Sequence, residues 1–171
     1  MPPPLLARVE AAEEAIRALP YEVALAFNRV GEQILRRTGL AERVCFSHAE
    51  LEAIHGGTLT HNHPAPVGYP DGGSFSLADA RLAVQENLAE LRAVSTSYRY
   101  SLRPGRRAWP SRARLEKVFG RVEPEVTRQL EAAVQDGTLT SRQAAGEREH
   151  RAWEQVAVEL GLIYAREAFE P

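Results

Sequence analysis

Apolar side chains recur every three to four residues in several parts of the chain, with charged residues between them. That spacing places the apolar groups on one face of an amphipathic helix. It predicts helices over residues 5–19, 47–54, 76–91, 111–119, 124–135 and 141–166. Ser47 followed by Glu50 is typical of a capping box, and Gly161 indicates a break near the end of the last helix.

Shorter runs rich in β-branched and aromatic residues separate these helices. They predict strands over residues 21–27, 32–39, 44–46, 58–61, 92–95 and 98–102. The turn-like residues 28–31 indicate that the first two strands form a hairpin. Residues 32–37 also favour a helix, which is the alternative interpretation there. Cys45 lies in the third run, where we expect a small buried hydrophobe.

The order of these elements predicts one α/β domain over residues 1–171, built in three layers with helices on both faces of a mixed sheet. Its core spans about 20–103 and a helical extension about 110–168. The extension buries an apolar face against the sheet or against a second copy in a dimer, and Trp109 and Trp153 are expected to pack. A composition of 44% hydrophobic and 26% charged residues is that of a globular protein.

Charge and hydropathy restrict the partners. The formal net charge is -2, and no apolar run approaches the roughly 20 residues of a membrane span. The first residues lack the pattern of a signal peptide, so we expect a cytoplasmic protein with no membrane partner. A basic run could bind nucleic acid, but flanking glutamates favour a solvated connector. The run comprises Arg103, Arg106, Arg107, Arg112, Arg114, Lys117 and Arg121.

Candidate chemistry centres on two histidines at the end of the strand predicted over 58–61. His61 and His63 are two residues apart, so their side chains leave the same face and can share one cation. Asp79, in the first turn of the helix that Ser76 caps, is the candidate third ligand. Two imidazoles and one carboxylate leave the fourth tetrahedral position of Zn²⁺ open, as in catalytic zinc sites.

Thr60-His61-Asn62-His63-Pro64 followed by Ser76-Leu77-Ala78-Asp79 resembles the JAB/JAMM (MPN+) metallopeptidase motif, HxHP followed by SxxD. The likeness extends to JAB-like domains of bacterial and phage proteins and covers residues 22–102. It implies a three-layer α/β/α, cytidine deaminase-like core. Fifteen residues separate His63 from Asp79, more than the family pattern usually has, which affects the shape of the loop at 65–73. Asp71 in that loop is a weaker rival for the third ligand.

The resemblance also assigns roles. Glu22 matches the catalytic glutamate as general base, with Glu32 as the second candidate, and Ser76 matches the serine that stabilises the oxyanion. It implies a zinc hydrolase that cleaves a peptide or isopeptide bond in a protein substrate, such as the tail of a ubiquitin-like protein. One alternative is a non-catalytic assembly module of a phage or defence system. Another is a hydrolase acting on nucleic acid, which the basic run and the RadC-like His-Asn-His-Pro sequence suggest.

Overall fold

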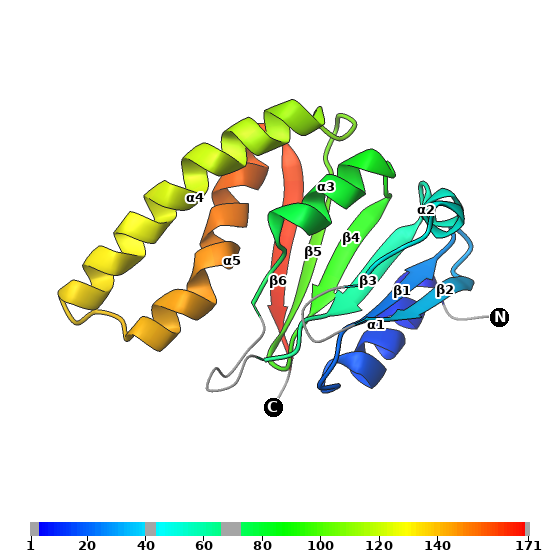
Figure 1. Ribbon diagram of the computed structural model, residues 1–171, viewed down its shortest axis with the longest axis horizontal. Helices are drawn as coiled ribbons and strands as arrows, with labels where there is room; N and C mark the ends of the chain where they lie inside the picture. Colours follow the sequence, from blue (N-terminus) through cyan, green and yellow to red (C-terminus); the bar gives the residue numbers. More distant parts are fainter. Residues whose placement is uncertain (1–3, 40–43, 66–72, 170–171) are drawn as a thin grey trace.

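The computed structural model describes residues 4–39, 44–65 and 73–169. Within these ranges the chain forms six strands and five helices (Figure 1). Strands β1 to β6 are Val23–Phe27, Gln33–Thr38, Thr58–Asn62, Glu90–Val94, Tyr98–Pro104 and Leu162–Ala168. Helices α1 to α5 are Leu5–Ile16, His48–Ile54, Leu77–Gln85, Arg112–Gln135 and Ser141–Leu160.

The strands form one mixed sheet in the order β2-β1-β3-β4-β5-β6. Strands β3 and β4 are parallel and are connected through α3, whereas every other neighbouring pair is antiparallel. The predicted α/β class and mixed sheet are therefore confirmed. Loops at the carboxyl ends of parallel strands commonly build binding sites, and in this sheet that edge follows β3 and β4.

Helices cover both faces of the sheet. Helix α1 packs on one face, where Val9 and Ile16 meet the alternate β1 residues Val23, Leu25 and Phe27. The other face carries α3, α4 and α5 over a larger core, which contains Ala24, Ala26 and the fully buried Trp153. Figure 1 shows these three helices over the second half of the sheet. The alternation along β1 thus assigns neighbouring residues to different cores.

The hairpin of β1 and β2 is confirmed, and the helical alternative for residues 32–37 is wrong. Gly31 adopts a φ of 81°, which favours glycine. The Asn28 side chain accepts hydrogen bonds from the backbone N–H groups of Val30 and Glu32. Turn chemistry therefore outweighs the helix propensity of the sequence that follows.

Residues 44–46 form no strand, contrary to the prediction, and Cys45 is exposed rather than buried. The segment passes the edge strand β2 and is held by a bond from Arg37 Nε to the Cys45 carbonyl. Val44 and Phe46 turn toward the larger core. Because alternate side chains of an extended segment point in opposite directions, Cys45 between them faces outward.

Helix α3 is shorter than predicted. It ends at Gln85 because Asn87 adopts a φ of 47°, a left-handed conformation that asparagine tolerates. Leu88 and Leu91, predicted on its buried face, lie in the following connection and in β4, where both are still buried.

The region after Ser111 forms one helix where two were predicted, because α4 continues through Pro124. Its buried side chains Val118, Val122, Val126 and Leu130 form an unbroken face against α5 on both sides of the proline. This packing offsets the missing backbone hydrogen bond.

The end of the last predicted helix is a strand. Gly161 stops α5 in a left-handed conformation, as the sequence indicated. The residues that follow pair antiparallel with β5 as strand β6. The C-terminal part therefore extends the sheet as well as covering it.

Candidate metal centre

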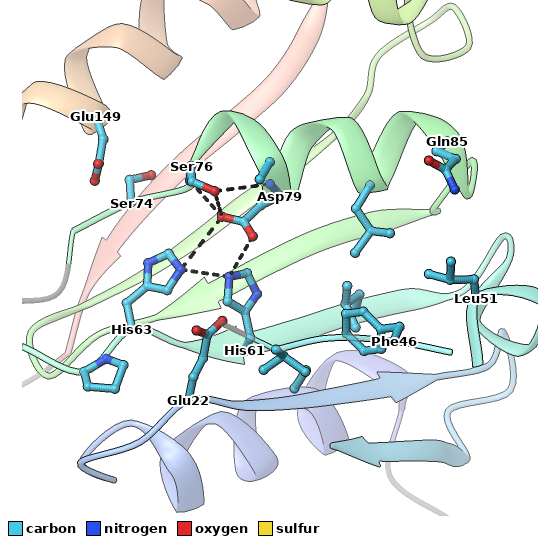
Figure 2. A pocket seen from close by; sticks show the side chains of 16 residues that line it. Glu22, Phe46, Leu51, His61, His63, Ser74, Ser76, Asp79, Gln85 and Glu149 are labelled. Carbon is cyan, nitrogen blue, oxygen red and sulfur yellow. Dashed lines mark hydrogen bonds and ion pairs between the residues drawn. The ribbon is translucent and has the colours of Figure 1, made fainter. Parts of the chain in front are cut away.

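Strand β3 supplies the two histidines. His61 is paired with Ala24 of β1 and Ala93 of β4, so it lies in the middle of the sheet. His63 follows the strand, and its backbone N–H donates to the Val94 carbonyl at 2.8 Å. The pleat directs both rings to the face covered by α3. Their Nε2 atoms are 2.8 Å apart (Figure 2).

Asp79 faces the histidines from the first turn of α3. Its Oδ1 lies 3.5 Å from His61 Nε2, and its Oδ2 lies 3.9 Å from His63 Nε2. The same Oδ2 accepts hydrogen bonds from the Ser76 N–H and hydroxyl, both at 2.7 Å, and the Ser76 hydroxyl in turn accepts from the Asp79 N–H. The predicted capping role of Ser76 is confirmed. This capping box fixes the carboxylate while Oδ1 remains directed at His61.

Glu22 lies on the other side of the histidine pair, directly before β1. Its side chain is 7% exposed. Within the described ranges its carboxylate has no hydrogen-bond or ion-pair partner, which is unusual for a buried acid. One carboxylate oxygen of Glu22 and one ring nitrogen of each histidine lie within 4.8 Å of one another. Figure 2 places Glu22 and Asp79 on opposite sides of the two rings.

Glu32, the second candidate for the base, lies at the hairpin turn. Its carboxylate accepts from Asn28 Nδ2 at 2.8 Å and is exposed. Strand β1 separates it from Glu22, so the structure places only the latter beside the histidines. Asp71, the rival ligand, lies outside the described residues.

The electrostatics of the site keep Asp79 ionised and His63 neutral, the forms that bind metal, whereas in the metal-free protein they favour the protonated form of His61. Burial opposes ionisation of Asp79, but His61 and His63 hold the pKa of its carboxyl well below the usual range. Burial and the adjacent His61 lower the pKa of His63 to about 4. Burial acts to lower the pKa of His61 as well, but the effect of Asp79 and Glu22 is larger, so the pKa of His61 is raised. Burial raises the pKa of Glu22. An ionised aspartate beside a neutral imidazole is a typical metal-binding pair.

The spacing of the donor atoms fits a small tetrahedral ion. With Zn–N bonds of 2.0–2.1 Å, two ligand atoms of a tetrahedral zinc are about 3.3 Å apart. The two histidine Nε2 atoms are 2.8 Å apart, Asp79 Oδ1 is 3.5 Å from His61 Nε2, and the other oxygen, Asp79 Oδ2, is 3.9 Å from His63 Nε2. Glu22, His61 and His63 form a set whose ligand atoms all lie within 4.8 Å of one another, and Asp79, fixed by its capping box, offers Oδ1 as an alternative third ligand. This cluster could therefore hold a metal.

The cluster opens into a cavity of about 540 Å³. Its two ends differ in chemistry, since Glu149, Ser74 and His63 lie at one end and Phe46 and Leu51 at the other (Figure 2). The other lining residues are Glu22, Ala24, Val44, Leu59, His61, Pro64, Ser76, Ala78, Asp79, Leu82 and Gln85. The cluster that could hold a metal therefore lies between two ends of the cavity with different side chains.

Helix α5 and strand β6 hold the loop that leads to Asp79. Trp153 Nε1 donates to the Phe75 carbonyl at 2.7 Å. The Ser74 hydroxyl lies 2.9 Å from the Tyr164 hydroxyl, which is itself 3.0 Å from His150 Nδ1. The sequence indicated packing for Trp153, which is confirmed, but gave no chemical role to these helices.

Two residues near the site escaped the sequence analysis. Asn62 points to the opposite face from the histidines, where its Oδ1 accepts from the Val23 N–H at 2.6 Å and its Nδ2 donates to the Leu19 and Tyr21 carbonyls. The alternation along β3 could have placed it there. Glu149 of α5 lines the cavity, and burial raises its pKa to about 7. No local motif marks Glu149.

The remaining candidates lie elsewhere. Two further histidines, His48 and His55, are exposed beside Glu52 and Glu86 and do not line the cavity. The seven side chains of the basic run are exposed, and Arg112 and Arg121 pair with glutamates. Trp109 packs against the larger core and donates to the Leu88 carbonyl at 2.7 Å.

Comparison with known proteins finds no match among family models, curated proteins or solved structures. Of the helices in the described ranges, none combines the length and apolar character needed to span a bilayer.

Proposed function

We propose that this chain is a zinc-dependent metallopeptidase of the JAMM type, which hydrolyses a peptide or isopeptide bond in an extended protein segment. The observation that carries the proposal is the convergence of His61, His63 and Asp79, with the buried Glu22 beside them, on one open cavity. In this proposal residues 20–103 correspond to a JAB/MPN-like core, to which the C-terminal part adds two helices and a strand.

His61, His63 and Asp79 would hold the ion at the wall of the cavity, and three protein ligands would leave a tetrahedral zinc one position for water. A zinc ion held there would lower the pKa of a water molecule toward 7 and polarise the scissile carbonyl. His63 is already neutral, His61 would release the proton that Asp79 and Glu22 favour when the ion binds, and Asp79 contributes its negative charge. Ser76 keeps Asp79 oriented through the capping box, and its hydroxyl is also the proposed oxyanion donor.

Glu22 is the proposed general base. Burial raises the pKa of its carboxyl, so the group accepts a proton more readily than an ordinary glutamate. In the reaction it takes one proton from the attacking water and gives it to the amine nitrogen as the C–N bond breaks.

Metal analysis of purified protein and of single variants tests the proposal. We expect one equivalent of zinc in the wild-type protein and in Glu22→Gln, and loss of zinc in His61→Ala and Asp79→Ala. His48→Ala, at an exposed histidine, is the matched control and should keep the metal. Cleavage of a peptide library, read by mass spectrometry, should fall by about a hundredfold or more in Glu22→Gln.

Retention of zinc in both His61→Ala and Asp79→Ala would contradict the assigned ligands. Loss of zinc in Glu22→Gln would make Glu22 a ligand instead of the base. Zinc binding without hydrolysis of any peptide or isopeptide would favour the non-catalytic assembly module.

A further inference from the structure

Helix α5 brings a third carboxylate to the cavity, from a part of the chain that the proposed mechanism does not use. Glu149 lines the cavity together with His63 and Asp79. Figure 2 shows its carboxylate directed from α5 toward the side where Ser74 and His63 lie. Phe46, Leu51 and Gln85 lie on the other side of the proposed metal cluster. A chain lying across the cluster would therefore meet Glu149 at one end only.

The backbone of the loop that precedes α3 fixes the Glu149 carboxylate. Glu149 accepts a hydrogen bond from the Ser74 N–H. A Cβ atom on Gly73 would lie 2.5 Å from Glu149 Oε2, and Gly73 has a φ of 83°, so only glycine lets the carboxylate approach this closely. The Gly73 carbonyl oxygen is itself 3.3 Å from His63 Nδ1. Ser74, which holds Glu149, therefore directly follows Gly73, whose carbonyl oxygen contacts the proposed ligand His63.

Little positive charge compensates Glu149. Its ion-pair partner among the described residues is Arg148, whose Nη2 lies 3.9 Å from Oε1 and whose guanidinium also faces Glu123. A divalent ion at the cluster would lie beside Glu22 and Asp79, so it would balance their charges first, and a cationic group placed next to Glu149 would favour the ionised form that burial opposes. The Glu149 side chain is 33% exposed, so a group in the cavity can reach it.

We propose that Glu149 is a specificity-determining residue that accepts a cationic group, an ammonium or guanidinium, on the side of the scissile bond that faces α5. This inference rests on the proposed hydrolase function. The cation would be either a lysine or arginine side chain or a free α-amine near the cleaved bond, since both present charged N–H donors to a carboxylate. Helix α5 would then select substrates as well as supporting the loop before Asp79.

Zinc-loaded protein and a set of internally quenched peptides test this role. In each peptide one position carries lysine or its uncharged analogue norleucine, and each sequence is prepared with a free and with an acetylated N-terminus. We expect one lysine position, or the free amine, to raise kcat/KM of the wild-type protein by about tenfold, as for a charge-assisted hydrogen bond. Glu149→Gln should reduce this preference to about twofold or less, because the amide keeps the size of the side chain without its charge.

Glu159→Gln is the matched control, since Glu159 is also on α5 but lies outside the cavity and pairs with Arg121. It should keep the preference. Zinc content and thermal melting of Glu149→Gln should equal those of the wild-type protein. Fluorescence anisotropy with the same peptides and zinc-loaded Glu22→Gln provides a binding readout that is independent of turnover.

Two outcomes are distinguished. If the wild-type protein cleaves peptides without preferring a cation, or if Glu149→Gln keeps the preference, the role of Glu149 is overturned while the proposed hydrolase stands. If the wild-type protein cleaves none of the peptides and binds charged and uncharged ones equally, both proposals fail.

Discussion

Strand β3 separates two buried groups of charged side chains, one on each face of the sheet. On the α1 face, Glu13 is fully buried and accepts hydrogen bonds from the Thr60 hydroxyl, from Arg92 and from Arg99 at 2.6–3.2 Å. On the other face, His61 lies between the carboxylates of Glu22 and Asp79. Thr60 and His61 are neighbours in the chain, and the pleat alone assigns them to different environments.

The two groups differ in how their charges are compensated. The Glu13 carboxylate has two guanidinium groups and a hydroxyl around it, so its burial is satisfied by this chain alone. The Glu22 carboxylate has no hydrogen-bond or ion-pair partner among the described residues, and the nearby His61 offsets only part of the effect of burial, which raises the pKa of Glu22. A satisfied buried charge is typical of a structural role, whereas an uncompensated one indicates a functional site. The comparison predicts that replacing glutamate by glutamine lowers the stability of the fold at Glu13 and raises it at Glu22.

Glu13→Gln should have the largest effect on stability. It leaves Arg92 and Arg99 with less opposing charge in a buried position, and removing one partner of a buried pair typically costs about 3–5 kcal/mol. Urea unfolding of the metal-free protein measures this change. Glu14→Gln is the control, because Glu14 is exposed and its ion-pair partner within the described ranges is Arg17 in the next turn, and it should cost less than about 0.5 kcal/mol. Equal stability of the two variants would show that the α1 face does not depend on its charges.

Asn62 lies on the α1 face but holds the backbone next to Glu22, whose side chain lies on the other face. Asn62→Ala should have the next largest effect on stability. The substitution removes the acceptor of the Val23 N–H, which should cost about 1–3 kcal/mol. Since Glu22 directly precedes Val23, hydrolysis should also fall by about tenfold or more from misplacement of the base. Kinetic assays and urea unfolding measure the two effects separately.

Asn28→Ala is the control for Asn62→Ala, because it removes side-chain hydrogen bonds at the opposite end of β1. It should destabilise the hairpin and leave hydrolysis unchanged. A loss of hydrolysis in Asn28→Ala as large as in Asn62→Ala would indicate a general effect on β1 instead of a local effect on Glu22.

Local sequence patterns predicted the fold class and most helices and strands. They failed where contacts with residues distant in the chain determine the secondary structure. The helix propensity before Gly161 continues into residues 162–166, but the open edge of β5 makes a strand more favourable there. In the same way, the packing of α4 on α5 keeps one helix through Pro124. Neither contact can be seen in the local sequence.

The candidate site follows the same rule. His61 and His63 were predicted from the period of a strand, and Asp79 and Ser76 from a helix start, because each pair lies within one local element. Glu22 was assigned only through the resemblance, and the pairing of β1 with β3 is what brings it beside His61. Glu149 is 70 residues after Asp79 in the chain, so only the folded structure places it at the cavity.

The smallest predicted effect on stability is a gain instead of a loss. In metal-free protein near pH 7, Glu22→Gln should increase the free energy of unfolding by on the order of 1 kcal/mol, because the amide avoids the cost of burying an unpartnered charge. The sign follows from the raised pKa of Glu22: the folded state holds this proton more tightly than the unfolded state, whose value is 4.5. Wild-type stability from this group is therefore complete below pH 4.5 and is lost as the pH rises through the folded pKa.

Thermal melting in EDTA at several pH values measures this difference. The two proteins should be equally stable at acidic pH, and Glu22→Gln should gain as the pH approaches neutrality. Zinc should reduce the gain, because the cation compensates the wild-type carboxylate. A destabilised Glu22→Gln, or a difference that does not change with pH, would mean that Glu22 has a partner in the fold and that the two faces of β3 compensate their charges alike. A gain of stability in Glu22→Gln would instead mean that the wild-type protein keeps a destabilising carboxylate beside its histidines, as expected of a group retained for its chemistry.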